Sequence, residues 1–137
     1  MRIVLDTNIL LVSVSDRSPY HLIFKSFIEE RYEICVTTEI LDEYAEILSK
    51  YSSQFLATNT LEVIENAANS VLITRYFAFE LIKNDPDDNK FVDCAIASNA
   101  DFIVTNDGHF NVLKEIPFPQ VNIISIDDFM EILKVSI

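Results

Sequence analysis

Residues 3–6 read Ile-Val-Leu-Asp, so three consecutive apolar residues come directly before the carboxylate of Asp6. A short, continuous apolar run is typical of a central strand that is buried on both faces of a sheet. Residues 102–107 read Phe-Ile-Val-Thr-Asn-Asp and repeat the arrangement, with Asp107 three residues after the apolar run. The sequence therefore predicts two buried strands, each of which leads into an acidic side chain.

Alternating strand and helix patterns extend outward from these two segments. Strands are expected at residues 3–5, 34–36, 72–73, 102–104 and 121–126. Helices are expected at residues 22–28, 40–48, 61–71, 87–99 and 127–135, with Thr37 or Thr38 capping the second of them. Strands that alternate with helices favour parallel pairing and right-handed crossovers. We therefore predict an α/β protein, a three-layer α/β/α sandwich around a central parallel sheet, with one domain over residues 1–137.

The composition excludes several classes of protein. Half of the 137 residues are apolar, which excludes a disordered protein. No apolar run approaches the roughly 20 residues that a membrane span needs. Cys35 and Cys94 are too few for a disulfide framework or a zinc site, and Asp6 comes too early for a secretory signal. We expect a cytoplasmic protein with no membrane partner.

The charge is strongly acidic. The formal net charge is −12, from 22 acidic and 10 basic residues. Proteins that hold nucleic acid mainly through a basic surface have the opposite balance, because phosphate contacts dominate non-specific affinity. Either nucleic acid is not the partner, or the acids form a metal site whose cations reverse the local field. Gly108 is the only glycine, which excludes a glycine-rich phosphate loop.

Ligands of open parallel sheets bind outside the carboxyl ends of the strands, where Asp6 and Asp107 are expected. Each of these acids could instead simply cap the following helix or turn. Glu43 lies at the margin of an apolar helical stripe, three residues after Ile40 and four before Ile47. It can therefore point towards the sheet edge, although a solvated acid on a helix surface is the alternative.

Asp88 gives a stronger signal. Phe91 and Val92 follow it at helical spacing, which places Asp88 on the buried face of its helix. A carboxylate on an apolar face is costly unless it is paired or bound to a metal. Asp93 flanks the same stripe and is an additional candidate ligand, whereas Asp85 and Asp87 are expected on the surface.

Four acids at one sheet edge would repel each other unless cations compensate them. Carboxylates and water suit Mg²⁺ or Mn²⁺ far better than zinc. His21 and His109 are isolated in the sequence and are expected to be ordinary surface or loop residues. No serine lies in a nucleophile-elbow context, so covalent serine catalysis has no support.

The residues around these acids resemble the motifs of the PIN-domain family. Positions 6–10 (Asp-Thr-Asn-Ile-Leu) look like its opening motif, in which a strand-end acid leads into the first helix. Positions 38–44 (Thr-Glu-Ile-Leu-Asp-Glu-Tyr) resemble the second motif, with Glu43 in the acidic position. Positions 85–91 (Asp-Pro-Asp-Asp-Asn-Lys-Phe) are similar to the third, and positions 100–107 (Ala-Asp-Phe-Ile-Val-Thr-Asn-Asp) match the fourth. Together the four motifs cover nearly the whole chain in the family's order.

This resemblance implies a metal-dependent nuclease, similar to the VapC-like toxins of prokaryotic toxin–antitoxin systems. It implies that the ligands of Mg²⁺ or Mn²⁺ are the acids Asp6, Glu43, Asp88 and Asp107. Asn8 and Thr105 would orient those ligands or a water molecule. The expected partners are an RNA substrate, an antitoxin protein and a second copy of the chain in a homodimer.

The resulting prediction is an endoribonuclease that hydrolyses RNA phosphodiester bonds. One alternative is a PIN fold that binds a partner without cleaving RNA. Another is a haloacid-dehalogenase-like phosphatase, whose chemistry needs a second Asp two residues after the first, where this chain has Asn8.

Overall fold

The computed structural model describes residues 1–83 and 85–135. At its centre is a five-stranded parallel sheet with the strand order β3-β2-β1-β4-β5. The strands are β1 (Arg2–Leu5), β2 (Glu33–Val36), β3 (Ser70–Leu72), β4 (Phe102–Val104) and β5 (Ile123–Ile124). The central position of β1 agrees with its apolar sequence, since Ile3, Val4 and Leu5 are all 0% exposed.

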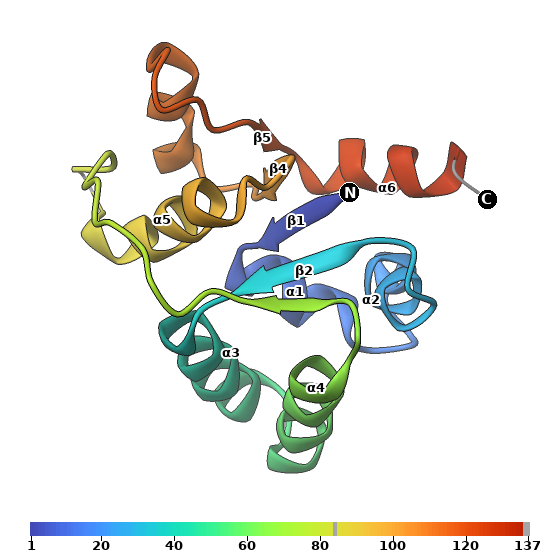
Figure 1. Cartoon of the computed structure of the whole chain (residues 1–137). Helices are drawn as coiled ribbons and strands as arrows, with labels where there is room; N and C mark the ends of the chain where they lie inside the picture. Colours follow the sequence, from blue (N-terminus) through green and yellow to red (C-terminus); the bar gives the residue numbers. More distant parts are fainter. Residues whose placement is uncertain (84, 136–137) are drawn as a thin grey trace.

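Helices cover both faces of this sheet. They are α1 (Thr7–Ser13), α2 (His21–Ile28), α3 (Thr38–Tyr51), α4 (Gln54–Asn66), α5 (Asn89–Ser98) and α6 (Ile126–Val135), with the 3-10 helices η1 (Pro86–Asp88) and η2 (Gly108–Glu115). Figure 1 shows α3 and α4 side by side below β2 and β3, whereas α5 lies to the left of the strands and packs against β1, β2 and β4. The predicted three-layer α/β/α sandwich is therefore confirmed. Among the described helices, none has both the length and the apolar character of a membrane span.

The direction of the chain across the sheet reverses beside β1. The chain passes from β1 to β2 and β3 on one side, then returns through α5 to β4 on the other side. β1 and β4 are direct neighbours, with Leu5 opposite Val104 at their carboxyl ends. Open α/β sheets bind ligands in the crevice at such a reversal. Asp6 and Asp107 follow the two strands that flank it.

Helix α3 begins at a capping threonine, and the side chain of Tyr44 fixes the helix to the end of β1. Thr37 caps the helix, since its hydroxyl oxygen accepts a hydrogen bond from the backbone N–H of Ile40 at 3.2 Å. The hydroxyl of the fully buried Tyr44 donates to the carbonyl of Leu5 at 2.6 Å. Because Glu43 directly precedes Tyr44, this contact brings Glu43 to the carboxyl edge of the sheet.

The irregular segment at residues 73–83, which follows β3, is docked onto α5. The side chain of Asn89 accepts from the N–H of Ile82 and donates to its carbonyl, both at 2.9 Å. At the other end of α5, Asn99 adopts a left-handed conformation with φ of 54°, which ends the helix before β4. The turn that holds Asp85 and Asp88 is therefore carried to the sheet edge by its attachment to α5.

Three predicted elements differ from the observed ones. The helix expected at residues 61–71 starts earlier, because Ser53 caps α4 at 3.0 Å from the N–H of Leu56, and it ends at Asn66 before β3. The helix expected at 87–99 is divided into η1 and α5. The last strand is only Ile123–Ile124. It ends there because the hydroxyl oxygen of Ser125 accepts a hydrogen bond from the N–H of Asp128 and so caps α6.

Candidate functional site

Asp6 occupies the end of β1, where only 7% of the residue is exposed. Its backbone N–H donates to the carbonyl of Val104 at 3.1 Å, which ties this position to β4. Burial raises the pKa of the Asp6 carboxyl above its usual value, and the charges of Asp107 and Glu43 add to the effect. The hydrogen bond from Thr105 opposes the rise. Asp6 is therefore a buried acid that lies among other acids.

Thr105 connects the acids that follow β1 and β4. Its hydroxyl donates to Oδ2 of Asp6 at 2.7 Å and accepts from the backbone N–H of Asp107 at 3.0 Å. Asp107 in turn begins η2, since its Oδ1 accepts from the N–H of His109 at 2.9 Å. The structure thus brings Asp6, Thr105 and Asp107 together at the carboxyl ends of neighbouring strands.

Asp88 brings a third acid to this edge. Its side chain is 13% exposed, and its Oδ2 is buried without a hydrogen-bond partner among the described residues. Burial raises the pKa of Asp88 from 3.8 to about 7, and the charges of Asp85, Asp107 and Asp6 contribute, while His109 lowers it. A buried carboxylate oxygen without a partner is costly, so the charged form of Asp88 needs a cation.

Four side chains from two loops converge here: Asp85, Asp88, Asp107 and His109. One ligand atom from each of them lies within 4.8 Å of all the others. The ring nitrogen Nδ1 of His109 is 3.4 Å from Asp107 Oδ1, 3.6 Å from Asp85 Oδ2 and 3.8 Å from Asp88 Oδ2. We call these four residues the acidic group.

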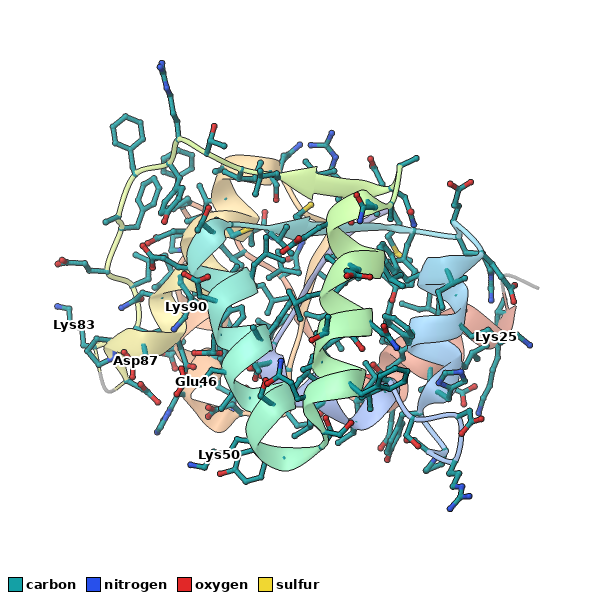
Figure 2. The ribbon with its side chains drawn as sticks, turned by 90° about the horizontal axis from the view of Figure 1, so that it is seen from below. Lys25, Glu46, Lys50, Lys83, Asp87 and Lys90 are labelled. Atoms are coloured by element: carbon teal, nitrogen blue, oxygen red, sulfur yellow. The ribbon has the colours of Figure 1, made fainter. Side chains whose placement is uncertain are left out.

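Glu43 lies near Asp6 and is not part of the acidic group. Its Oε2 accepts a hydrogen bond from the Thr7 hydroxyl, and its Oε1 lies 2.8 Å from Nζ of Lys90. Both members of this ion pair are largely buried, with side chains 27% and 15% exposed. Figure 2 shows Lys90 beside α3, on the same side of the molecule as Asp87. Lys90 therefore already neutralises the charge of Glu43 in this structure.

The comparisons with known proteins agree with this geometry. The family model described as PIN domain matches residues 2–109. This chain belongs to the PIN-domain family. No curated protein matches it.

Among solved structures, this PIN domain is similar to one described as the crystal structure of VapBC2 from Rickettsia felis bound to a DNA fragment from their promoter. The TM-score is 0.59 and the sequence identity 18%, over 91% of this chain and 98% of the other. At this identity the likeness concerns the fold.

Asn8 and Asp93 were two further candidates from the sequence. The structure places Asn8 beside the acids at the sheet edge and Asp93 away from them. Asn8 is exposed and lines a cavity together with Asp6, Asp107 and Asn106. Asp93 is buried on α5, but its Oδ1 accepts from the N–H of Phe79 at 3.0 Å. Burial raises the pKa of Asp93, and the charges that add to the rise belong to Glu39 and Glu80. The structure therefore does not bring Asp93 into the acidic group of the PIN domain.

Two members of the acidic group, Asp85 and His109, were expected to be ordinary surface residues. Their side chains are 38% and 48% exposed, but the sequence did not predict that they lie beside Asp88 and Asp107. Asp85 and Asp88 are three residues apart, and side chains at this spacing lie on the same side of a 3-10 turn. His109 follows Asp107 by two residues, and the hydrogen bond to its N–H folds the loop back on the acid. These short spacings were the only signals in the sequence, because both residues lie outside the expected strands and helices.

The residues of this edge fit a divalent metal ion. The buried Oδ2 of Asp88 has no hydrogen-bond partner in the part of the chain that the structure describes, and a cation beside it would supply one. Carboxylate oxygens are the ligands that hard divalent ions prefer. The donor set is therefore of the right chemical kind, and the charge repulsion within it gives a physical reason for the ion to bind.

Proposed function

We propose that this PIN domain is a metal-dependent endoribonuclease that hydrolyses RNA phosphodiester bonds, and that it is the toxin of a toxin–antitoxin pair. The observation that carries the nuclease proposal is the buried, unpartnered oxygen of Asp88 among the acids at the β1–β4 crevice. Membership of the PIN-domain family supports it. The toxin part is supported by the motif resemblance and by the shared fold with the VapBC2 structure.

In this proposal Asp6, Asp88 and Asp107 hold Mg²⁺ or Mn²⁺, and Glu43 completes the set. When bound, the ion would lower the pKa of a water molecule and polarise the scissile phosphate. Glu43 can serve as a ligand only if it exchanges its contact with Lys90 for the ion. Lys90 would then be free to bind a phosphate oxygen of the RNA.

The proposed partners follow from the charge of the chain. With a net charge of −12, the surface attracts basic protein segments and repels RNA outside the site. An antitoxin that inserts an Arg or Lys among the acids would take the place of the ion. A second copy of the chain and a cytoplasmic location are proposed from the family resemblance.

A metal titration followed by thermal melting distinguishes the nuclease from a PIN fold that only binds a partner. Ligands that bind only the folded state stabilise it, by about 1.4 kcal/mol at ten times the dissociation constant. We expect the melting temperature to rise by several degrees with Mn²⁺ or Mg²⁺ and to be unaffected by the same concentration of K⁺. A melting temperature that stays constant across the titration would favour the binding module.

Thr105→Val tests the positioning of the acids. The substitution removes both the donor to Asp6 and the acceptor of the Asp107 N–H, while it keeps the side-chain shape. Because partners of metal ligands typically contribute 10–100-fold to metal affinity or activity, we expect metal affinity to fall about tenfold.

Thr105→Ser is the matched control for this experiment, since it keeps the hydroxyl. It should bind the ion almost as the unmodified protein does. Isothermal titration with Mn²⁺ measures both variants, and equal affinities for Val and Ser would show that the hydroxyl does not position the acids.

A further inference from the structure

We propose that His109 is itself a ligand of the metal ion, and that its nitrogen makes the site bind Mn²⁺ more tightly than Mg²⁺. The proposal rests on the proposed function, since it concerns the ion that Asp88 and Asp107 would hold, and it adds Asp85 and His109 to the ligands of that ion. The four acids implied by the family resemblance contain only oxygen donors. A nitrogen donor would therefore be a feature of this chain's own site.

The His109 ring is positioned by the loop that carries it. The N–H of His109 donates to Oδ1 of Asp107 at 2.9 Å, so the residue is held at the start of η2. Its Nδ1 faces three carboxylate oxygens, from Asp85, Asp88 and Asp107, at 3.4–3.8 Å. These distances exceed those of good N–H···O hydrogen bonds, so the nitrogen is not committed to one acid.

The same distances suit atoms that share an ion. With metal–oxygen bonds of about 2.1 Å, neighbouring ligands of an octahedral ion are about 3.0 Å apart and opposite ligands about 4.2 Å apart. The separations from Nδ1 lie between these two values, and the four ligand atoms of the acidic group all lie within 4.8 Å of one another. Small side-chain movements would close the four atoms around one ion.

The unpartnered oxygen of Asp88 supports this arrangement independently. Oδ2 is buried, and Nδ1 of His109, the group with which the described residues pair it, is 3.8 Å away. A protonated imidazole at that distance does not supply the missing hydrogen bond. An ion between the two atoms would satisfy both the oxygen and the nitrogen.

The nitrogen decides which ion is preferred. Mg²⁺ favours oxygen ligands and retains water, whereas imidazole is a good ligand of first-row transition ions. Three carboxylates and one imidazole should therefore hold Mn²⁺ more tightly than Mg²⁺. Removal of the imidazole should reduce this preference and leave an all-oxygen site.

The experiment compares the unmodified protein with His109→Gln and with His21→Gln as control. His21 lies elsewhere, at the start of α2, where its Nδ1 is 2.9 Å from the carbonyl of Ser13. Isothermal titration should show Mn²⁺ affinity roughly tenfold lower in His109→Gln, with Mg²⁺ affinity changed much less. Electron spin-echo envelope modulation of bound Mn²⁺ should show coupling to ¹⁴N of an imidazole, lost in His109→Gln and kept in His21→Gln.

Each other outcome has a defined meaning. If Mn²⁺ binds without ¹⁴N coupling, or His109→Gln keeps the preference for Mn²⁺, His109 is not a ligand, and the acid site of the proposed function still stands. If His109→Gln binds both ions more tightly, the ring is a counter-charge that competes with the ion, which also overturns the proposal. If the unmodified protein binds neither ion, the proposed function fails together with this inference.

Discussion

Asp107→Asn should lower the rate of RNA cleavage by more than about 100-fold, because loss of a ligand should exceed the 10–100-fold effect of losing a ligand's partner. The protein should remain folded. Asn can still cap η2 by accepting from the N–H of His109. The charge of Asp107 also raises the pKa of both Asp6 and Asp88, so its removal relieves repulsion.

Single-turnover cleavage of a labelled RNA at saturating Mn²⁺ measures this effect. Asp16→Asn is a suitable control, since it removes the same charge from an exposed loop between α1 and α2. The control should cleave at the unmodified rate. Near-normal cleavage by Asp107→Asn, with the ion bound, would remove Asp107 from the proposed site.

Asp88→Asn should stabilise the metal-free protein at pH 8 by about 2 kcal/mol and leave it almost unchanged at pH 4. The pKa of Asp88 is raised from 3.8 to about 7, so at pH values between these two the folded protein retains a proton that the unfolded chain has lost. Between these pH values the stability of the unmodified protein falls as pH rises. The full shift corresponds to roughly 4 kcal/mol, and side-chain rearrangement around the charged acid reduces it.

Urea unfolding at several pH values in the presence of a chelator provides the measurement. Asp87→Asn is the matched control, because Asp87 lies in the same turn but is exposed. Saturating Mn²⁺ should reverse the order of stability, since the ion needs the charged Asp88. A stability difference that is the same at pH 4 and pH 8 would contradict a raised pKa for Asp88.

The strands and the acids that follow them could be predicted from the sequence, because both signals are local. Three apolar residues before Asp6 and before Asp107 indicate buried strands, and parallel strands bring their carboxyl ends to one edge. A cap at Thr37 or Thr38 was predicted for the same reason, and the structure has it at Thr37. The burial of Asp88 could be read from the apolar residues that follow it.

Contacts between segments that lie far apart in the sequence could not be predicted from such local patterns. A helical wheel gives the face on which Asp93 lies, but not that the segment before η1 crosses that face and donates to it from Phe79. The pairing of Glu43 with Lys90 joins α3 to α5 and depends on how the two helices lie across the sheet. The position of His109 depends on η2, whose 3-10 turns leave no clear periodicity in the sequence.

Because the chain reverses direction between β1 and β4, the acids of the site leave the ribosome at different times during translation. Once β1, β2 and β3 have left the ribosome, these three strands can pair, and the nascent chain already carries Asp6 and Glu43. The remaining acids arrive with η1 and with the residues after β4, which must insert beside β1 from the opposite side. The ribosome is therefore exposed to a complete cluster of acids only after Asp107, which lies in the last third of the chain, has emerged.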